Sequence, residues 1–344
     1  MRFRRAAGIA LACAASTLGI HCGFVAGLQD WRLDDKTTDA SRRGEGGTSG
    51  DLDARGKDDA QAAIDDASLA DASDADIPRC SPQALFGPGA PITELNSADN
   101  EAFARLSPDE LTVYFTSDRL SASPKIFKAT RASVASVFTG IGPVPELDMA
   151  SLFEDAPALA ADGLTLFLQA TDNNSVPRNV YMATRLSTLT PFDAPVGLTN
   201  LASPAHHPYA LPPAGGLGRR FAFAGGTKDV GPFTTYEAGF PVAGVPPIVS
   251  IVSFAAGSYS GFDAPVMTND GKEFFGTEQG NIWHATRPGP TGQFSTPVIV
   301  NELNDATQFE LPDWISPDNC RLYYHQSTPS SGFQLFVASR PQLP

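Results

Sequence analysis

The side chains best suited to chemistry in this sequence are carboxylates and histidines that recur at one place in a repeated pattern. Each precedes a turn at a similar distance, where the innermost strand of a repeat would begin. Carboxylates and imidazoles together could bind a divalent cation, and two carboxylates could hydrolyse a glycosidic bond. A water-filled polar channel whose acids bind nothing is the third interpretation. The residues concerned are Glu101, Glu154, Asp155, His206, His207, Asp263 and Glu310.

The two adjacent histidines restrict the metal interpretation. Neighbouring side chains of a strand point to opposite faces, so at most one of His206 and His207 should face the channel unless the strand bulges. The sequence contains no His-Glu-x-x-His, no Gly-x-Ser-x-Gly and no phosphate-binding glycine loop. It therefore predicts no catalytic residue, no metal and no cofactor.

The elements that would position these residues repeat with a period of about 50 residues. The clearest mark is a Ser or Thr followed by Arg, directly after an apolar strand. A degenerate copy at 234–239 fills the double gap between the second and third marks. The marks are Thr130-Arg131, Thr184-Arg185, Thr286-Arg287 and Ser339-Arg340.

Upstream of each mark, a turn leads into another strand. Pro presets φ for such turns, and Gly adopts positive φ without strain. We therefore predict that the recurring aspartates shape turns and have no catalytic role. These aspartates are Asp109, Asp162, Asp270 and Asp318.

Downstream of the mark, an aromatic residue, a Pro and apolar residues recur, as in Phe192–Val196 and Phe294–Val298. Pro is tolerated on an edge strand, so this segment predicts the outermost strand of a four-stranded blade. One copy, Phe86–Asn96, precedes the first repeat, and the last repeat lacks one. The sequence thus predicts an all-β fold over 80–344, a single β-propeller of about five blades that this N-terminal strand closes.

The cysteines agree with that closure. Cys80 lies just before the closing strand, and Cys320 lies in the turn of the last blade. These two segments are neighbours only if the ring closes in this way. We therefore predict a Cys80–Cys320 disulfide, the alternative being two free thiols.

The first 79 residues differ in composition from the rest. Residues 1–26 have a basic start and an apolar run, as secretory signals do. Residues 27–79, rich in Asp, Ala, Ser and Gly, predict an acidic disordered linker. The signal could end in lipidation at Cys22 or in ordinary cleavage near Ala26. We expect an exported protein, periplasmic or anchored at the outer membrane or cell surface.

A family resemblance supports the fold. The units Leu106–Asp109, Tyr114–Arg119, Ile315–Asp318 and Leu322–Tyr324 resemble the Pro-Asp repeats of TolB-like, WD-type β-propellers. The resemblance covers residues 83–344, although the second copy has Ala161 in place of Pro. It implies an exported propeller that binds other molecules through its surface, and it does not specify a function.

Three functions remain open from the sequence. The favoured one is a non-enzymatic cell-envelope protein whose propeller binds a protein, a peptide or a glycan. The alternative is a carbohydrate-active hydrolase with carboxylates at the channel mouth; a metal-stabilised structural propeller is a third possibility. The formal charge of −14 argues against nucleic acid as a partner, and contact with a membrane is expected only through a lipid anchor.

Overall fold

The computed structural model describes residues 80–344, apart from 82–83, 121–122, 151, 173–177, 199–200, 202–203, 213–218, 227–232, 241–248, 256–260, 330–331 and 344. The predicted signal, the acidic linker and the lipidation site at Cys22 lie outside the described residues. Within the described part of the chain, no helix has the length and hydrophobicity to cross a membrane.

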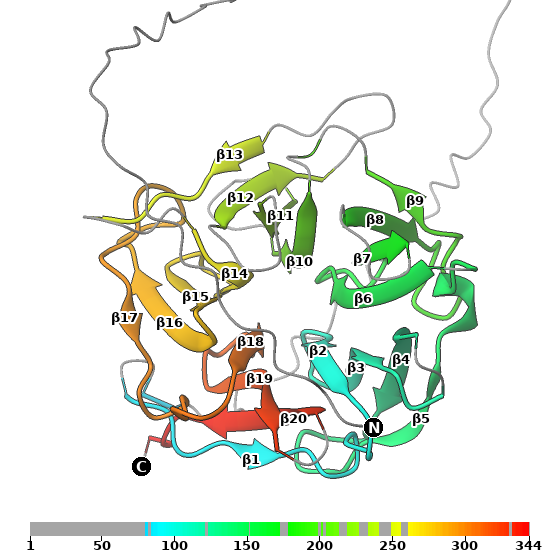
Figure 1. The fold of residues 1–344 in the computed structure, drawn as a ribbon, viewed down its shortest axis with the longest axis horizontal. Coiled ribbons are helices and arrows are strands. Elements are labelled where there is room, and N and C mark those ends of the chain that lie inside the picture. Colours follow the sequence, from blue (N-terminus) through cyan, green and yellow to red (C-terminus); the bar gives the residue numbers. More distant parts are fainter. Residues whose placement is uncertain are drawn as a thin grey trace, which may run out of the picture. The chain divides into compact units, whose positions relative to one another are not determined.

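Five antiparallel sheets of four strands each surround a central axis, which confirms the predicted propeller (Figure 1). The innermost strands of blades one to five are, in that order, β2 (Glu101–Leu106), β6 (Leu152–Leu159), β10 (Ala205–Leu211), β14 (Asp263–Met267) and β18 (Glu310–Ile315). The next are β3 (Thr112–Ser117), β7 (Thr165–Asp172), β11 (Arg220–Gly225), β15 (Glu273–Glu278) and β19 (Arg321–Thr328).

The outer half of each blade completes the ring. The third strands are β4 (Lys125–Thr130), β8 (Asn179–Thr184), β12 (Thr234–Gly239), β16 (Asn281–Thr286) and β20 (Gly332–Ser339). The short edge strands are β5 (Thr139–Pro143), β9 (Val196–Gly197), β13 (Val249–Ile251), β17 (Val298–Ile299) and β1 (Ala90–Pro91). A 3-10 helix, η1 (Pro145–Leu147), follows β5. The degenerate repeat at 234–239 is thus a regular third strand.

The ring closes as the displaced edge strand predicts. Strand β1 pairs with β20 through Ala90 opposite Val337 and Pro91 opposite Phe336. Residue Gly87 donates its N–H to the carbonyl of Ser339 at 2.8 Å, which extends the pairing. The last blade therefore contains both ends of the propeller. The N-terminal β1 supplies its fourth strand, so β20 is not left as an unpaired edge.

The Arg of each mark has a structural role that the sequence did not reveal. Its guanidinium lies over the phenyl ring that opens the edge segment of the same blade, a cation–π contact. The pairs are Arg131–Phe138, Arg185–Phe192, Arg287–Phe294 and Arg340–Phe86, at 4.5, 4.4, 4.2 and 4.5 Å. In the degenerate blade, Arg219 over Phe240 at 4.4 Å replaces the pair. We call these five contacts the arginine clamps.

The recurring aspartates shape turns, as predicted. Each carboxylate accepts a hydrogen bond from the backbone N–H two residues later, at 2.9–3.0 Å, which fixes the turn into the second strand. Gly163 and Gly271 follow in these turns with φ of 66° and 68°, a conformation in which Gly is not strained.

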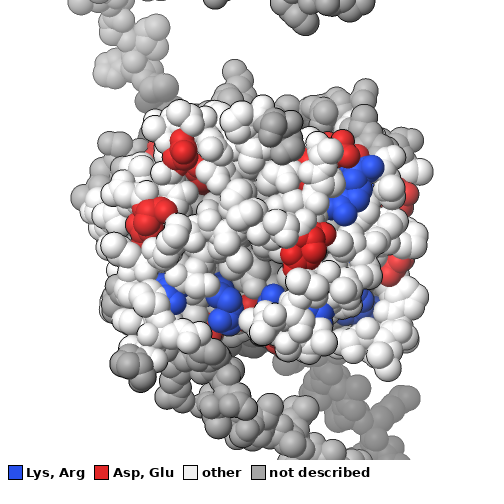
Figure 2. All heavy atoms as spheres, turned by 90° about the horizontal axis from the view of Figure 1, so that it is seen from below, with Lys and Arg blue, Asp and Glu red and all other residues white. Residues whose placement is uncertain are grey.

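The core consists mainly of apolar and aromatic side chains that pack between neighbouring blades. Phe167 on β7 stacks on Phe221 of β11, with ring centroids 4.5 Å apart. Tyr114 on β3 meets Phe192 of the next blade edge to face. On the face of the molecule seen in Figure 2, charged side chains stand in small separate groups among uncharged ones.

Candidate binding site at the channel mouth

The innermost strands share a bulge near their first residues, where their register to the second strand shifts. In four of them, the bulged residue has a positive φ of 45–54°. A bulge interrupts the alternation of side chains, so two consecutive residues can point to the same side. The four residues are Phe103, Ala156, His207 and Ala264.

The three predicted glutamates precede the bulge and are fully buried. Each accepts a backbone N–H from the segment before its own strand: Glu101 from Ser97 at 2.8 Å, Glu154 from Met149 at 2.7 Å and Glu310 from Asp305 at 3.1 Å. They therefore fix the entry of the chain into the innermost strands.

Cations and burial complete the environment of these glutamates. Arg119 pairs with Glu101 at 3.1 Å, and Lys125 pairs with Glu154 at 2.6 Å. Burial, partly offset by hydrogen bonds, raises the pKa of Glu154 and of Glu310. None of the three glutamates is among the described residues that line the cavity at the mouth, so a binding role for them stays a prediction without a contact to support it.

The residue that follows the glutamate position lines the mouth of the channel in four blades, as Ala102, Asp155, His207 and Leu311, and the corresponding carboxylate of the remaining blade is Asp263. In blade two this is Asp155, which accepts hydrogen bonds from Thr116 at 2.7 Å, from the N–H of Ala156 at 2.8 Å and from Gln169 at 3.1 Å. In blade four it is Asp263, which accepts from the N–H of Ala264 at 2.8 Å. Both carboxylates are thus held in place by donors from the bulge itself.

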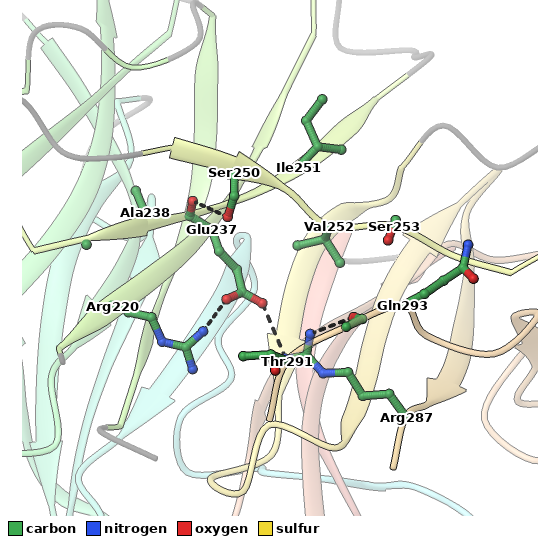
Figure 3. A pocket seen from close by; sticks show the side chains of 12 residues that line it. Arg220, Glu237, Ala238, Ser250, Ile251, Val252, Ser253, Arg287, Thr291 and Gln293 are labelled. Carbon is green, nitrogen blue, oxygen red and sulfur yellow. Dashed lines mark hydrogen bonds and ion pairs between the residues drawn. The ribbon is translucent and has the colours of Figure 1, made fainter. Parts of the chain in front are cut away.

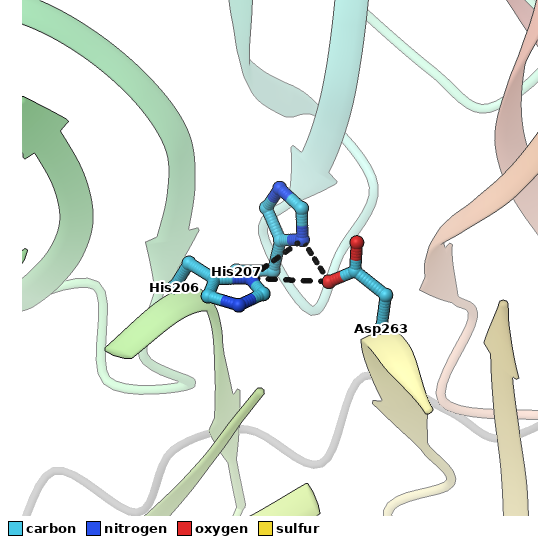
Figure 4. A group of neighbouring side chains, drawn as sticks. All are labelled: His206, His207 and Asp263. Carbon is cyan, nitrogen blue, oxygen red and sulfur yellow. Dashed lines mark hydrogen bonds and ion pairs between the residues drawn. The ribbon is translucent and has the colours of Figure 1, made fainter. Parts of the chain in front are cut away.

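The predicted histidine pair meets Asp263 because the strand bulges. The Nδ1 atoms of His206 and His207 lie 3.4 Å apart, and Nδ1 of His206 lies 3.2 Å from Oδ1 of Asp263 (Figure 4). His207 makes a direct hydrogen bond to the same oxygen. From the sequence, both imidazoles could share a site only if the strand bulged. The strand does bulge there, so this condition is met.

The titration of this cluster follows from its burial. Burial lowers the pKa of His207, and Asp263 offsets only part of this effect. Burial alone would raise the pKa of Asp263, but the two histidines outweigh it and hold that pKa well below its usual range.

A cavity of about 420 Å³ opens at this end of the channel, and we call it the mouth pocket. It combines rings, carboxylates and a guanidinium. A run of ring contacts crosses it, from His207 to Phe103, then His325, then Phe333, with centroids 4.6, 4.5 and 5.1 Å apart. Its lining residues are Asn100, Ala102, Phe103, Thr116, Asp118, Pro124, Asp155, Arg178, His207, Leu311, His325 and Phe333.

An apolar layer adjoins the mouth pocket near the channel axis. Ala102, Phe103, Ala156 and Ala264 contact one another there and pack on Leu311. Because these residues come from four of the five blades, the layer lies across the axis. The mouth pocket therefore has an apolar patch in its lining, made by Ala102, Phe103 and Leu311.

Sequence reasoning placed Asp155 and His207 at the mouth but missed other lining residues. Asp118 accepts the N–H of Asn100 at 2.7 Å and ends a repeat unit, which was a usable signal. His325 pairs with buried Asp313 at 2.7 Å. Arg178 lies just before β8, where no repeated feature marks it.

A second cavity, of about 360 Å³, lies between the outer strands of blades three and four (Figure 3). Glu237 bridges Arg220 of its own blade to Arg287 of the next, the latter at 3.4 Å. Arg287 also donates to the carbonyls of Gly271 and Gly292 and belongs to an arginine clamp. The polar groups of this cavity are largely used in joining blades, so it is the weaker candidate.

Comparison with known proteins shows the fold and no family. No family model matches the chain, and no curated protein matches it significantly. A structure assigned as an exo-β-1,3-galactanase from Bifidobacterium bifidum is 13% identical, covers 76% of this chain and 93% of its own, and has a TM-score of 0.50. An α-L-arabinofuranosidase from Podospora anserina is also 13% identical. The match covers 76% of this chain and 98% of the arabinofuranosidase, with a TM-score of 0.49.

A structure assigned as TolB from Agrobacterium tumefaciens is also similar. Its identity is 12%, the coverage is 74% of this chain and 90% of that one, and the TM-score is 0.40. Glycoside hydrolases predominate among these similar structures. At such identities the similarity concerns the fold alone, and the five four-stranded sheets of the chain itself show the five-bladed β-propeller.

Proposed function

We propose that this propeller binds a carbohydrate in the mouth pocket. The supporting observation is the composition of that pocket, in which ring faces stand beside carboxylate side chains and a guanidinium. Sugars offer apolar C–H faces that pack on rings and hydroxyl groups that donate to carboxylates. The volume of about 420 Å³ lies in the range of small-molecule sites.

Hydrolysis of a glycan is the second candidate. It is favoured by the galactanase and arabinofuranosidase names of structures with this fold. It is also favoured by Asp155, because three hydrogen-bond donors fix the orientation of its carboxylate, as a catalytic base requires. A glycosidase also needs a carboxylic acid with a raised pKa at the bond to be cleaved. Glu154 and Glu310 have a raised pKa, and each directly precedes a residue that lines the mouth pocket. Neither glutamate lines that pocket itself. The balance therefore favours binding.

A glycan array followed by calorimetry tests the proposal. We expect wild-type protein to bind particular oligosaccharides and Asp155→Asn to weaken that binding about 10-fold or more, because a charge-assisted hydrogen bond is lost. The matched control is Asp162→Asn, a turn aspartate of the same blade, which should bind as wild type does. Equal binding by both variants, or no glycan bound at all, would contradict the proposal.

The same ligands separate binding from cleavage. Release of reducing sugar from a bound oligosaccharide, abolished in Asp155→Asn at an unchanged melting temperature, would establish the second candidate. Binding without release would establish the first. Peptide arrays run in parallel would detect the peptide partner that the sequence leaves open.

The site of action that we propose is the cell envelope, on the basis of the signal-like residues 1–26. Fractionation of cells that express the full chain should place it outside the cytoplasm. Replacement of Cys22 by Ser should release it from the membrane fraction if Cys22 is lipidated and should change nothing if cleavage occurs near Ala26. Retention in the cytoplasm would contradict export.

A further inference from the structure

We propose that His206, His207 and Asp263 form a binding site for one divalent transition-metal ion, with zinc as the representative ion. The three residues lie at the junction of blades three and four, beside the mouth pocket. The proposal concerns a site that carbohydrate binding does not require. It stands or falls independently of that function.

The positions of the ligand atoms carry the proposal. One atom from each residue lies within 4.8 Å of the others, and the two Nδ1 atoms face the same carboxylate oxygen (Figure 4). Ligand atoms about 2.0–2.1 Å from a tetrahedral zinc ion lie about 3.4 Å from one another. The separations of 3.4 Å between the imidazoles and 3.2 Å from His206 to Asp263 match that spacing.

The remaining edge of the triangle is the hydrogen bond between His207 and Asp263. A metal ion would replace the proton of this bond, because Nδ1 must be unprotonated to coordinate. The carboxylate and imidazole would then separate slightly, and one proton would leave to solvent for each Nδ1–H displaced.

The fold brings these ligands together through two features. The bulge at His207, with φ of 48°, directs both histidine side chains to one side of β10. Asp263 is the first residue of β14 in the next blade and reaches across the junction. Phe103, Ala156 and Ala264 occupy bulges with similar φ, so the backbone shape belongs to the fold, and the imidazoles are specific to blade three.

The surroundings hold the ligands rigidly. The side chains of His206, His207 and Asp263 are only 3%, 5% and 13% exposed. Phe103 stacks on His207, and Phe233 packs edge to face on His206 at 5.3 Å. Since His207 lines the mouth pocket, an ion can enter from there, and a fourth coordination position would face that cavity.

The ligand set selects the class of metal. Two imidazoles and a carboxylate suit zinc, cobalt, nickel, copper or ferrous iron, whereas calcium and magnesium prefer sites made of oxygen ligands. The charge of Arg178 acts on His207 and opposes a cation, while the carboxylate group of Asp263 favours one. The competing interpretation is a plain hydrogen-bonded triad, in which neutral imidazoles donate to Asp263 and no metal binds.

The test uses untagged full-length protein, freed of metal by dialysis against a chelator. Calorimetric titration with zinc chloride should show one tight site per chain, and zinc should raise the melting temperature. Cobalt should give the visible absorption of a four-coordinate ion and should be displaced by zinc. Removal of one ligand in His206→Asn should weaken zinc binding more than about 100-fold, the upper end of what loss of a mere supporting residue costs.

The matched control is His284→Gln, because His284 also pairs with a carboxylate, Glu273, at 3.0 Å but belongs to no group of three potential metal ligands among the residues that the structure describes. It should bind zinc as wild type does. If His206→Asn fails to fold, zinc-edge anomalous diffraction of the wild-type crystal locates the ion directly. Absence of tight zinc binding in wild type, an ion located elsewhere, or undiminished binding in folded His206→Asn would overturn the proposal in favour of the hydrogen-bonded triad.

Discussion

At the scale of single residues, Glu273 shows how this propeller stabilises a charge in its interior. The carboxylate accepts a hydrogen bond from Arg340 at 2.9 Å and one from His284 at 3.0 Å. Burial alone would raise the pKa of Glu273, but these two partners outweigh it and lower that pKa. Because Arg340 follows β20, this pair connects blade four to the closing blade.

Replacing Glu273 by Gln should therefore destabilise the protein in a pH-dependent way. The side chains of Glu273 and Arg340 are only 10% and 4% exposed, and removing one partner of a buried pair costs about 3–5 kcal/mol. Since the folded-state pKa is lowered, the stabilisation is complete above the ordinary value of 4.5 and is lost as pH falls through the folded-state pKa.

Urea unfolding of wild type and Glu273→Gln at pH 7 and at acid pH measures this effect. The difference in unfolding free energy should shrink as pH falls below 4.5. Exposed Asp99 provides the control, because Asp99→Asn should change little at either pH. A difference that is the same at both pH values would show that the loss comes from packing.

At the scale of elements, the arginine clamps explain why the repeat mark ends in Arg. Arg185 donates Nε–H to the carbonyl of Gly163 at 2.7 Å while its guanidinium covers Phe192. One side chain thus ties the third strand of a blade to the turn before its second strand and to its edge segment. Lys could not replace it, since an ammonium lacks the planar donor fork.

The clamp predicts a measurable coupling between two side chains. Arg185→Gln should cost about 2–3 kcal/mol, because it removes a charged hydrogen bond as well as the cation–π contact. Phe192→Leu keeps an apolar contact and removes the ring face. A double-mutant cycle by urea unfolding should give a coupling of about 0.5–2 kcal/mol, and strictly additive losses would contradict the clamp.

At the scale of the whole molecule, stability depends on the pairing of β1 with β20, which connects the first segment of the propeller to the last and which we call the joint. Strand β1 has only two residues in the ladder, and the disulfide between Cys80 and Cys320 reinforces it, with Cα atoms 5.6 Å apart. The backbones of Cys80 and Gln342 also form an isolated bridge. A covalent link at the joint keeps the first segment of the propeller in contact with the last.

Loss of the disulfide should cost much of the stability of the propeller. The linked residues are 240 positions apart, and the chain-entropy model gives about 5 kcal/mol for so large a loop. We expect the double variant Cys80→Ser/Cys320→Ser, and reduced wild type, to unfold at clearly lower urea concentration than oxidised wild type. Mass spectrometry of a non-reduced digest should show the two peptides joined. Equal unfolding midpoints for oxidised and reduced protein would contradict this prediction.

The sequence alone predicted most of the architecture, because its signals are local. The period, the turn residues Asp109 and Asp318 and the misplaced edge strand at Phe86–Asn96 each reflect chemistry within a few neighbouring residues. From them follow the five blades, the closure by the N-terminal strand and the disulfide. A blade cannot bury both faces without its neighbours, so the repeats must pack on one another, and the displaced edge strand indicates that they close into a ring.

The tertiary structure decided which of these residues form the site. Strand periodicity assigns alternate side chains to opposite faces, but the bulges break that alternation, and no sequence rule fixes their position. As a result, Glu154 turns into the protein while adjacent Asp155 faces the channel, and His206 and His207 meet Asp263 from another blade. Such contacts join residues far apart in sequence, and only the packing of blade against blade determines them.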